Sequence, residues 1–233
     1  MKRAGSLFLG CVLCLSLAAC GGGGNEQPEG FNAELPEGMM WVTKTQEVYP
    51  LDPGCAVTGA ARLGSRLLIA GVSKDLAPVL ALAGYIVEDD GSVSIGDAMP
   101  LSLDEPDAVD ETCLYGVCAG GDGAFYVLTG ERPAAYTDSD GVWVENENYT
   151  GRYSILQYSE GGELTGRMKL TGWHGAFVKG IAVGSGGAVV LYGDSYLSLL
   201  RWNGDVIRTE ELEEGFEVQS VSCDGQGLVA SVF

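Results

Sequence analysis

The stretch GIAVGSGGAVVLYGD, residues 180–194, contains two short apolar runs separated by a glycine-rich turn. Such a turn can open a phosphate-binding loop, but a dinucleotide fingerprint needs a third glycine where Val189 stands. It also needs a helix after the turn, whereas AVVLYG is rich in β-branched and aromatic residues, which favour a strand. The stretch therefore predicts a β-hairpin and excludes a nucleotide site.

The same pattern recurs along the chain. VCAGGDGAFYVL begins at Val117, IAVGSGGAVVLY at Ile181 and VSCDGQGLVASV at Val221. When the three copies are superposed, their turns align at Gly123, Gly187 and Gly227. A more degenerate copy, TGAARLGSRLLIAG, occupies residues 58–71. Each copy predicts one hairpin of two strands.

A second unit follows each of the first three hairpins: YIVEDDGSVSIGDAMPL from Tyr85, LQYSEGGELTGRMKL from Leu156 and LLRWNGDVIRTEEL from Leu199. Each has an apolar or aromatic strand, an acidic glycine turn and an alternating strand that ends in Leu. Four strands in a repeat of about 40 residues resemble the blades of a β-propeller. For the run from Ala77, APVLALAGYIV, this spacing favours a strand over a short helix.

We therefore predict an all-β, propeller-like fold with about three blades and a partial fourth. Closed propellers typically have four to eight blades, so the sequence predicts an incomplete propeller, the front part of a longer product. The alternative is a closed ring of four blades in which WVTKTQEV, from Trp41, adds an outer strand to the last one. The predicted blades are roughly residues 58–103, 115–170, 180–212 and 220–233.

The first twenty residues, MKRAGSLFLGCVLCLSLAAC, have the layout of an export signal: Lys2 and Arg3, an apolar run and small residues at the end. Their last four residues, LAAC, resemble the lipobox of bacterial lipoproteins. The resemblance implies that residues 1–19 are cleaved and that Cys20 carries a diacylglycerol and acyl chains such as palmitate. It also implies a location on the extracytoplasmic face of the cell membrane. The alternative is an ordinary secretory signal that happens to contain a cysteine.

The residues after Cys20, GGGGNEQPEG, favour a flexible tether, so we divide the mature chain into a tether (20–40) and a folded domain (41–233). The formal net charge of −19 excludes a nucleic-acid partner and contact with anionic lipid through a basic patch. Membrane attachment is therefore expected through the lipid on Cys20.

Four cysteines lie in the predicted domain: Cys55, Cys113, Cys118 and Cys223. No two of them have the CxxC spacing of zinc or redox sites, so we expect no metal site or cofactor. Cys55 and Cys113 stand at matching places in adjacent repeats, which allows a disulfide between blades outside the cell. Free thiols buried as small apolar side chains are the alternative.

One segment breaks the repeat. The shift from the hairpin at Val117 to the one at Ile181 is longer than the shift from Ile181 to the one at Val221, and the extra residues fall in 131–153. Insertions in repeat proteins often carry binding function. Aromatic rings there could stack on sugars, and the acids and amides could bind a cation, although DSDG is an incomplete match to a calcium loop. A hairpin of GVWVEN with YTGRYSI is the structural alternative. The candidate residues are Tyr136, Asp138, Asp140, Trp143, Asn146, Asn148 and Tyr149.

Catalytic signals are sparse. His174 is the one histidine and has no predicted Ser or Cys partner, and the triplet GDS at 193–195 fits a turn between strands. We therefore expect a membrane-anchored binding or interaction module for a protein or carbohydrate ligand, and no enzyme. The combination of lipobox and blades resembles the propeller segments of bacterial solute-binding lipoproteins. The alternatives are the first part of such a transport lipoprotein or of an extracellular propeller glycosidase, lyase or dehydrogenase.

Overall fold

The computed structural model describes residues 51, 54–87, 93–103, 112–132, 135–145, 151–170, 177–223 and 228–232. The predicted signal peptide, Cys20, the tether and residues 41–48 lie outside these ranges, as do His174 and Gly227. In the part of the chain that is described, no helix has the length and apolar character needed to cross a membrane.

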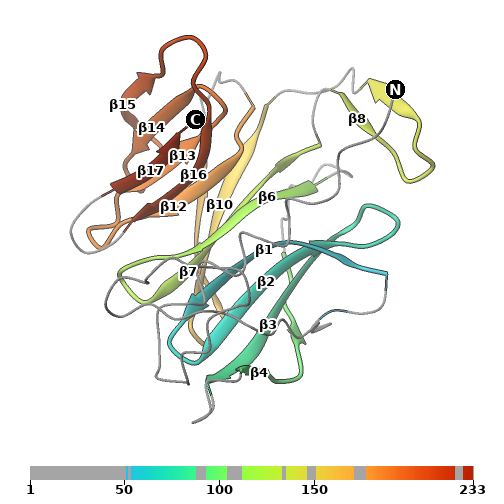
Figure 1. Cartoon of the computed structure of the whole chain (residues 1–233). Helices are drawn as coiled ribbons and strands as arrows, with labels where there is room; N and C mark the ends of the chain where they lie inside the picture. The colour runs from blue at the N-terminus through green and yellow to red at the C-terminus, as the bar shows by residue number, and fades with distance from the viewer. Residues whose placement is uncertain are drawn as a thin grey trace, which may run out of the picture. The chain divides into compact units, whose positions relative to one another are not determined.

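The described elements are all strands, which confirms the all-β prediction (Figure 1). They are β1 (Ala56–Leu63), β2 (Arg66–Val72), β3 (Pro78–Val87), β4 (Val93–Ile95), β5 (Met99–Pro100), β6 (Thr112–Ala119), β7 (Ala124–Glu131), β8 (Ala135–Thr137), β9 (Trp143–Glu145), β10 (Tyr153–Ser159), β11 (Leu164–Lys169), β12 (Gly180–Val183), β13 (Val189–Tyr192), β14 (Tyr196–Leu200), β15 (Val206–Glu211), β16 (Val218–Cys223) and β17 (Leu228–Val232).

The chain divides into two compact units. One comprises Met1–Tyr49 and Tyr85–Gly96, and its described part is a short hairpin in which the end of β3 pairs with β4. The other comprises Pro50–Gly84 and Asp97–Phe233 and contains all the remaining strands. The following description concerns this larger unit.

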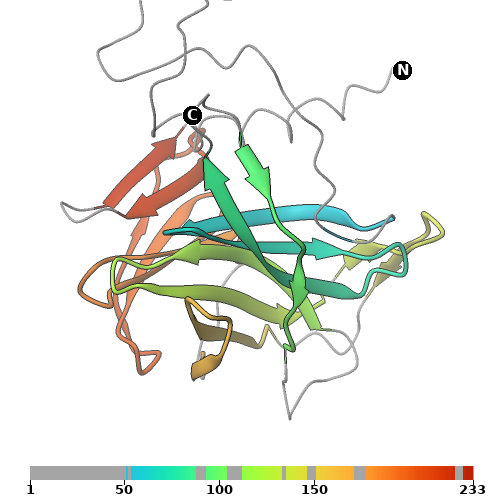
Figure 2. The same cartoon turned by 90° about the horizontal axis from the view of Figure 1, so that it is seen from below.

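Its strands form successive antiparallel sheets, which we call blades 1 to 4 (Figure 2). Blade 1 contains β1, β2 and β3, with β5 paired to β3. Blade 2 has the order β6-β7-β10-β11 and blade 3 the order β12-β13-β14-β15. Blade 4 is the pair β16-β17. The predicted strand in residues 77–87 is confirmed by β3.

Blade 2 is apolar on both faces. Phe125 and Val127 of β7 pack against blade 1, whereas the alternate residues Tyr126 and Leu128 pack against blade 3. All four are almost completely buried. Because successive side chains of a strand point to opposite faces, one continuous apolar run such as AFYVL fills two cores at once.

The first strands of successive blades lie next to one another. β1 contacts β6, β6 contacts β12, and β12 contacts β16. The approach is close at Gly116, where a Cβ atom would lie 3.3 Å from the Cα atom of Gly180. Blades that are stacked face to face with adjacent first strands form a propeller-like arrangement, as the repeat predicted.

The quoted stretch is a β-hairpin, as predicted. The Gly184 N–H donates to the Ala188 carbonyl (2.9 Å), the Gly187 N–H donates to the Gly184 carbonyl (3.1 Å), and Gly187 has a φ of +74°. The turn at Gly123 has the same two bonds and a φ of +83°. This is a turn closed by a residue in the left-handed region, which favours glycine.

Candidate functional site

We define the entry rim as the end of blades 2 and 3 at which β6, β10, β12 and β14 begin and β7 and β13 end. The pairs Thr112↔Glu131, Tyr153↔Gly130 and Gly180↔Tyr192 place these strand ends together within each blade. The inserted segment and the connections to β12 and β14 emerge here, whereas the turns at Gly123 and Gly187 lie at the opposite end, which we call the corner end.

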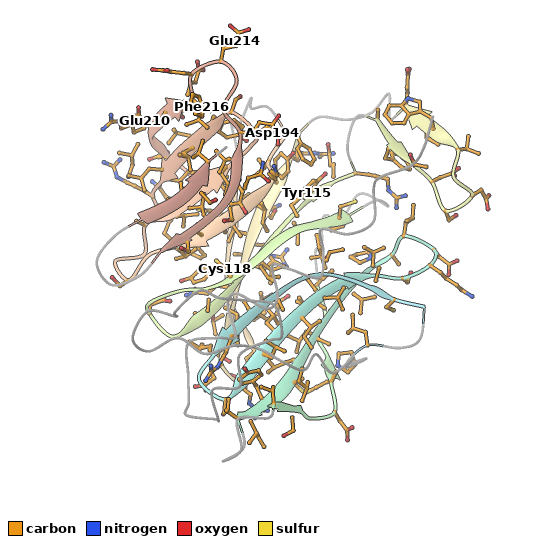
Figure 3. All side chains as sticks on the ribbon, in the orientation of Figure 1. Tyr115, Cys118, Asp194, Glu210, Glu214 and Phe216 are labelled. Carbon is orange, nitrogen blue, oxygen red and sulfur yellow. The ribbon has the colours of Figure 1, made fainter. Side chains whose placement is uncertain are left out.

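Three aromatic rings gather at the entry rim. The ring of Tyr115 makes edge contacts with Tyr153 at 5.2 Å between centroids and with Phe177 at 5.6 Å. Tyr115 is on β6 of blade 2, with Cys118 three residues further along the strand (Figure 3). Phe177 lies just before β12 of blade 3 and is 47% exposed. The group therefore joins two blades and also presents one ring to solvent.

The hydroxyls of these tyrosines are used inside the protein. Tyr115 donates to the Glu131 carbonyl (2.5 Å), and Tyr153 accepts a long bond from the Val178 N–H (3.4 Å). Tyr196, at the start of β14, donates to the Phe177 carbonyl (3.1 Å). These bonds fix the strand ends and hold the backbone that carries Phe177.

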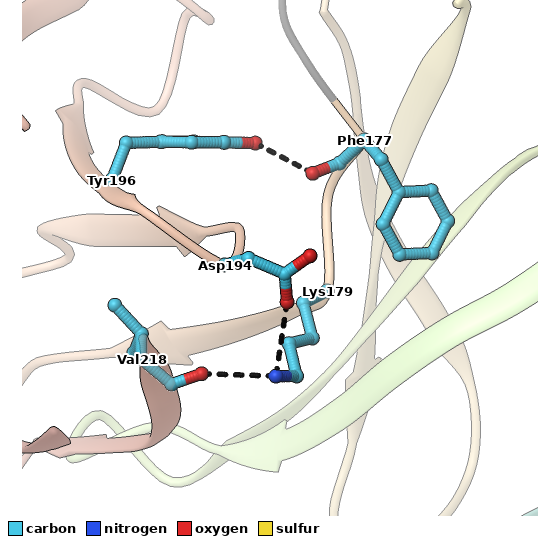
Figure 4. Close-up of polar contacts among 5 residues, drawn as sticks. All are labelled: Phe177, Lys179, Asp194, Tyr196 and Val218. Atoms are coloured by element: carbon cyan, nitrogen blue, oxygen red, sulfur yellow. Dashed lines mark hydrogen bonds and ion pairs between the residues drawn. The ribbon is translucent and has the colours of Figure 1, made fainter. Parts of the chain in front are cut away.

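A lysine joins blade 3 to blade 4 beside these aromatics (Figure 4). Lys179 Nζ lies 3.0 Å from Asp194 Oδ1 and donates to the Val218 carbonyl at 3.0 Å. The Val218 N–H in turn donates to the Asp194 carbonyl at 2.6 Å. Val218 is fully buried, whereas the side chains of Lys179 and Asp194 are 32% and 62% exposed. This arrangement, which we call the lysine latch, fixes the start of blade 4.

The inserted segment contains a separate short hairpin, in which β8 pairs with β9. The expected pairing of GVWVEN with YTGRYSI is wrong, because β9 pairs with residues 135–137 and β10 pairs with β7 and β11. A strand whose two edges are already hydrogen-bonded has no backbone groups left for a third partner. The hairpin tip exposes Val142 (56%) and Trp143 (66%).

The structure separates the predicted loop residues by role. Asp138 Oδ1 accepts hydrogen bonds from the N–H groups of Asp140 (3.0 Å) and Val142 (2.8 Å), so Asp138 serves the turn of its own hairpin. Tyr136 is half-buried beneath the guanidinium of Arg132, 4.8 Å from the ring centroid. Trp143 and Asp140 are exposed. Asn146, Asn148 and Tyr149 lie outside the described residues.

One of the two carboxylate oxygens of Asp138, Oδ1, is thus hydrogen-bonded to amides of the same turn. In the described ranges, no three His, Cys, Asp or Glu side chains are grouped as they would be to hold a metal ion. The triplet GDS at 193–195 forms the connection between β13 and β14, as the turn interpretation predicted.

The corner end holds a polar group that the sequence did not point out. The Tyr126 hydroxyl donates to Asp122 Oδ2 (2.6 Å) and accepts from Gln157 Nε2 (2.9 Å), and its ring meets Trp202 of blade 3 edge-on at 5.5 Å. Burial, and then the bond to the Asp122 carboxylate, raise the pKa of Tyr126 far above its ordinary value. The tyrosine therefore stays protonated and acts as a structural link.

The structure does not join Cys55 to Cys113 by a disulfide, and both side chains are half-buried. The two residues are one register position apart. Gly59 of β1 and Gly116 of β6 both follow a bulge and therefore occupy equivalent positions. Three residues before them stand Ala56 and Cys113, so Cys113 is equivalent to Ala56 and not to Cys55. Because neighbouring residues of a strand point to opposite faces, this shift sends the two thiols in different directions.

The bulges also explain which rim residues the sequence analysis missed. Bulges leave one extra residue in β1, β6 and β16, namely Thr58, Tyr115 and Gln219. Lys179 occupies the corresponding place directly before Gly180 of β12. Bulges redirect side chains at strand ends. A glycine follows each of Thr58, Tyr115 and Lys179, and this is the signal of these positions in the sequence. The glycine alone does not show a bulge, because a bulged residue is recognised only from the register of the paired strands.

No family model matches the chain, and no curated protein matches it. Solved structures that match it include a protein of unknown function from Bacteroides caccae, with 15% identity, a TM-score of 0.43 and coverage of 75% of this chain and 51% of that one. A luciferin-regenerating enzyme matches with 12% identity, a TM-score of 0.30 and coverage of 71% and 65%. A gluconolactonase from Xanthomonas campestris matches with 11% identity, a TM-score of 0.31 and coverage of 78% and 84%.

The chain thus spans about half the length of the Bacteroides caccae protein and about two thirds of the luciferin-regenerating enzyme. At these identities and scores the likeness concerns the fold and carries no argument about a ligand. The propeller-like assignment stands on the sheets of this chain.

Proposed function

We propose that this chain is an extracytoplasmic lipoprotein, anchored through Cys20, whose entry rim binds a protein or carbohydrate ligand. It acts as a binding module and not as an enzyme. The anchor and the location follow from the resemblance of LAAC to a lipobox. The binding role follows from the rim.

The observation that carries the binding role is the contrast between rings and polar groups at the entry rim. Trp143, at the tip of the inserted hairpin that emerges from the rim, is 66% exposed, and Phe177, at the rim itself, is 47% exposed. The polar side chains beside them are engaged internally: Asp138 in its turn, Tyr115 with the Glu131 carbonyl, and Lys179 in the latch. Exposed aromatic rings whose polar neighbours already have hydrogen-bond partners suit stacking contacts with a ligand. Aromatic side chains provide such contacts at low entropic cost.

The anchor is tested by metabolic labelling with palmitate in a bacterial host. The full chain should incorporate label and fractionate with membranes, and the Cys20→Ser variant should lose the label. The Cys14→Ser variant serves as a matched control, because Cys14 lies inside the predicted leader and should not affect labelling. Equal labelling of the Cys20→Ser variant would contradict the anchor.

The rim is tested with the purified full chain in detergent against arrays of glycans and of cell-envelope proteins from the host. Trp143→Ala and Phe177→Ala should each weaken any binding found by tenfold or more. Trp202→Ala is the control, because Trp202 is an aromatic residue at the corner end. Equal losses for all three variants would place the site elsewhere. A parallel assay for glycoside and lactone hydrolysis tests the enzyme alternative: turnover abolished by a rim substitution would contradict the proposal.

A further inference from the structure

Five turns in the described part of the larger unit close in the same way. In each, a glycine with a positive φ donates its N–H to the carbonyl three residues earlier. These glycines are Gly123, Gly141, Gly162, Gly187 and Gly204. The residues directly before them are Asp122, Asp140, Gly161, Gly186 and Asn203. Of these five positions, the one at Asn203, in the turn between β14 and β15, carries a side-chain amide.

An asparagine that is followed by glycine can lose its amide group without an enzyme. The backbone nitrogen of the glycine attacks the side-chain carbon Cγ of the asparagine, and glycine allows this approach because it has no Cβ and a permissive backbone. The chain has five asparagines, and Asn203 is the one that glycine follows. Glu, Ala, Glu and Tyr follow Asn25, Asn32, Asn146 and Asn148.

Asn203 is exposed, so water reaches it, but its amide is held in place. Nδ2 donates to Asp205 Oδ2 (2.7 Å), and Oδ1 accepts from the Asp205 N–H (3.1 Å). The attacking group is engaged as well, because the Gly204 N–H donates to the Arg201 carbonyl (2.9 Å). The reaction needs a rotated amide and a released Gly204 N–H. These three hydrogen bonds must therefore open first.

We propose that Asn203 is a site of spontaneous deamidation and that its turn, through Asp205, sets the rate. Gly204 N gives up its proton to water or hydroxide and forms a bond to Asn203 Cγ, and the Cγ–Nδ2 bond breaks with release of ammonia. The cyclic imide then adds one water molecule and opens to aspartate or to isoaspartate. The sum is asparagine plus water to acid plus ammonia, so no oxidant, reductant or cofactor takes part.

The turn lies at a contact between blades 2 and 3, so its modification has a structural consequence. Trp202 meets the Tyr126 ring edge-on at 5.5 Å, and a Cβ atom on Gly204 would lie 3.1 Å from the Lys169 carbonyl oxygen. Aspartate in place of the asparagine puts a second carboxylate beside Asp205, where an amide now donates. Isoaspartate lengthens the backbone of a closely seated turn by one atom. Both products therefore loosen the contact of Trp202 with blade 2.

The test follows the peptide that contains Asn203 by mass spectrometry. The purified full chain in detergent is incubated at mildly alkaline pH, with and without guanidinium chloride, and digested at intervals. Aspartate and isoaspartate forms should accumulate in both conditions, and faster by tenfold or more in the denaturant, because it opens all three bonds of the turn. The other four asparagines are internal references and should react more slowly than Asn203 in the denaturant.

Two variants isolate the contribution of the turn. Asp205→Ala removes the acceptor of Nδ2 and changes no reacting atom, so the folded variant should deamidate roughly two- to tenfold faster than the wild type, as expected for the loss of one hydrogen bond. In guanidinium chloride the two rates should be alike.

Asp140→Asn is the matched comparison, because it creates an Asn–Gly pair in a turn with the same backbone bond, from the Gly141 N–H to the Asp138 carbonyl. Val142 stands there in the place of Asp205 and offers no carboxylate. The new pair should react faster than Asn203 in the folded chain and at a similar rate in the denaturant.

The proposal is wrong if Asn203 stays intact in guanidinium chloride, if denaturation leaves its rate unchanged, or if the folded Asp205→Ala variant reacts no faster than the wild type. The structural consequence is measured with Asn203→Asp, which is the aspartate product itself. Its amide hydrogen exchange over residues 201–206 should be faster than in the wild type, with exchange at the Gly187 turn unchanged. Equal exchange over residues 201–206 in both proteins would reject the loosening of Trp202.

Discussion

The two ends of the blades are built differently. At the corner end, the turns at Gly123, Gly187, Gly162 and Gly204 share one pattern of backbone bonds, and each of these glycines has a positive φ. At the entry rim, the connections differ between the blades: the inserted segment in blade 2, and Gly193 to Ser195 in blade 3.

The difference shows how a repeat divides its tasks. The corner end sets the register of each hairpin in blades 2 and 3 and uses the same kind of glycine turn in both. The entry rim is free of that requirement and can carry an insertion, exposed rings and a latch. Loops at one end of a rigid scaffold are the usual place for binding function. The predictions below test this division, from the largest expected effect to the smallest.

The scaffold itself should be the most sensitive part. Leu128→Ala and Leu156→Ala each remove a fully buried side chain, one facing blade 3 and the other facing blade 1. Each should lower the free energy of unfolding by about 2–5 kcal/mol through lost burial and a residual cavity. Denaturant unfolding measures the loss. If only one of the two variants were destabilised, blade 2 would not be packed on both faces.

The contact between neighbouring corners should come next. A Cβ atom on Gly121 would lie 2.7 Å from the Cα atom of Ser185, which is backbone and cannot rotate away. Gly121→Ala should therefore cost about 1–3 kcal/mol of stability. Gly161→Ala, whose Cβ would meet Ser159 Oγ at an ordinary 3.6 Å, is the matched control. Equal stability of the two variants would mean that the corners of blades 2 and 3 are not in contact.

The turns should show a smaller effect that depends on φ alone. A Cβ atom on Gly123 or Gly187 would meet nothing within 4 Å, so alanine there strains the backbone and nothing else. Each substitution should cost about 1 kcal/mol. Gly186→Ala, with equal space and no positive φ, should be neutral or slightly stabilising. Thermal unfolding of the three variants would contradict the turn assignment if Gly186→Ala were the least stable.

The lysine latch should have the smallest effect. Because Lys179 and Asp194 are partly solvated, the ion pair itself contributes little, and Lys179→Met should cost less than about 1 kcal/mol. High salt should reduce the difference from the wild type, since it screens exposed charges. In the Lys179→Met variant, amide hydrogen exchange should be faster in β16 than in β12. If the amides of both strands exchanged at the same rate, the lysine latch would not be what holds blade 4 in place.

The sequence predicted the repeating part of this molecule well and its exceptions less well. The alternation of apolar runs with glycine turns located the blades, because each strand must bury its side chains and each turn needs a left-handed residue. It did not show that Cys55 and Cys113 differ by one register position, nor that Asp138 serves its own turn. Both depend on which backbone groups are hydrogen-bonded to each other. The same pattern of apolar and glycine residues is compatible with more than one such pairing.

The sequence by itself determined the strands, the turns, the acidic character and the lipobox-like end of the leader, because periodicity, φ preferences and charge are local properties. Tertiary structure alone decided that Tyr115, Tyr153 and Phe177 meet, that Lys179 reaches Val218, and that Tyr126 lies beneath Trp202. These contacts join residues that are between 38 and 76 positions apart in the chain. Their proximity follows from the stacking of whole sheets, which no single segment encodes.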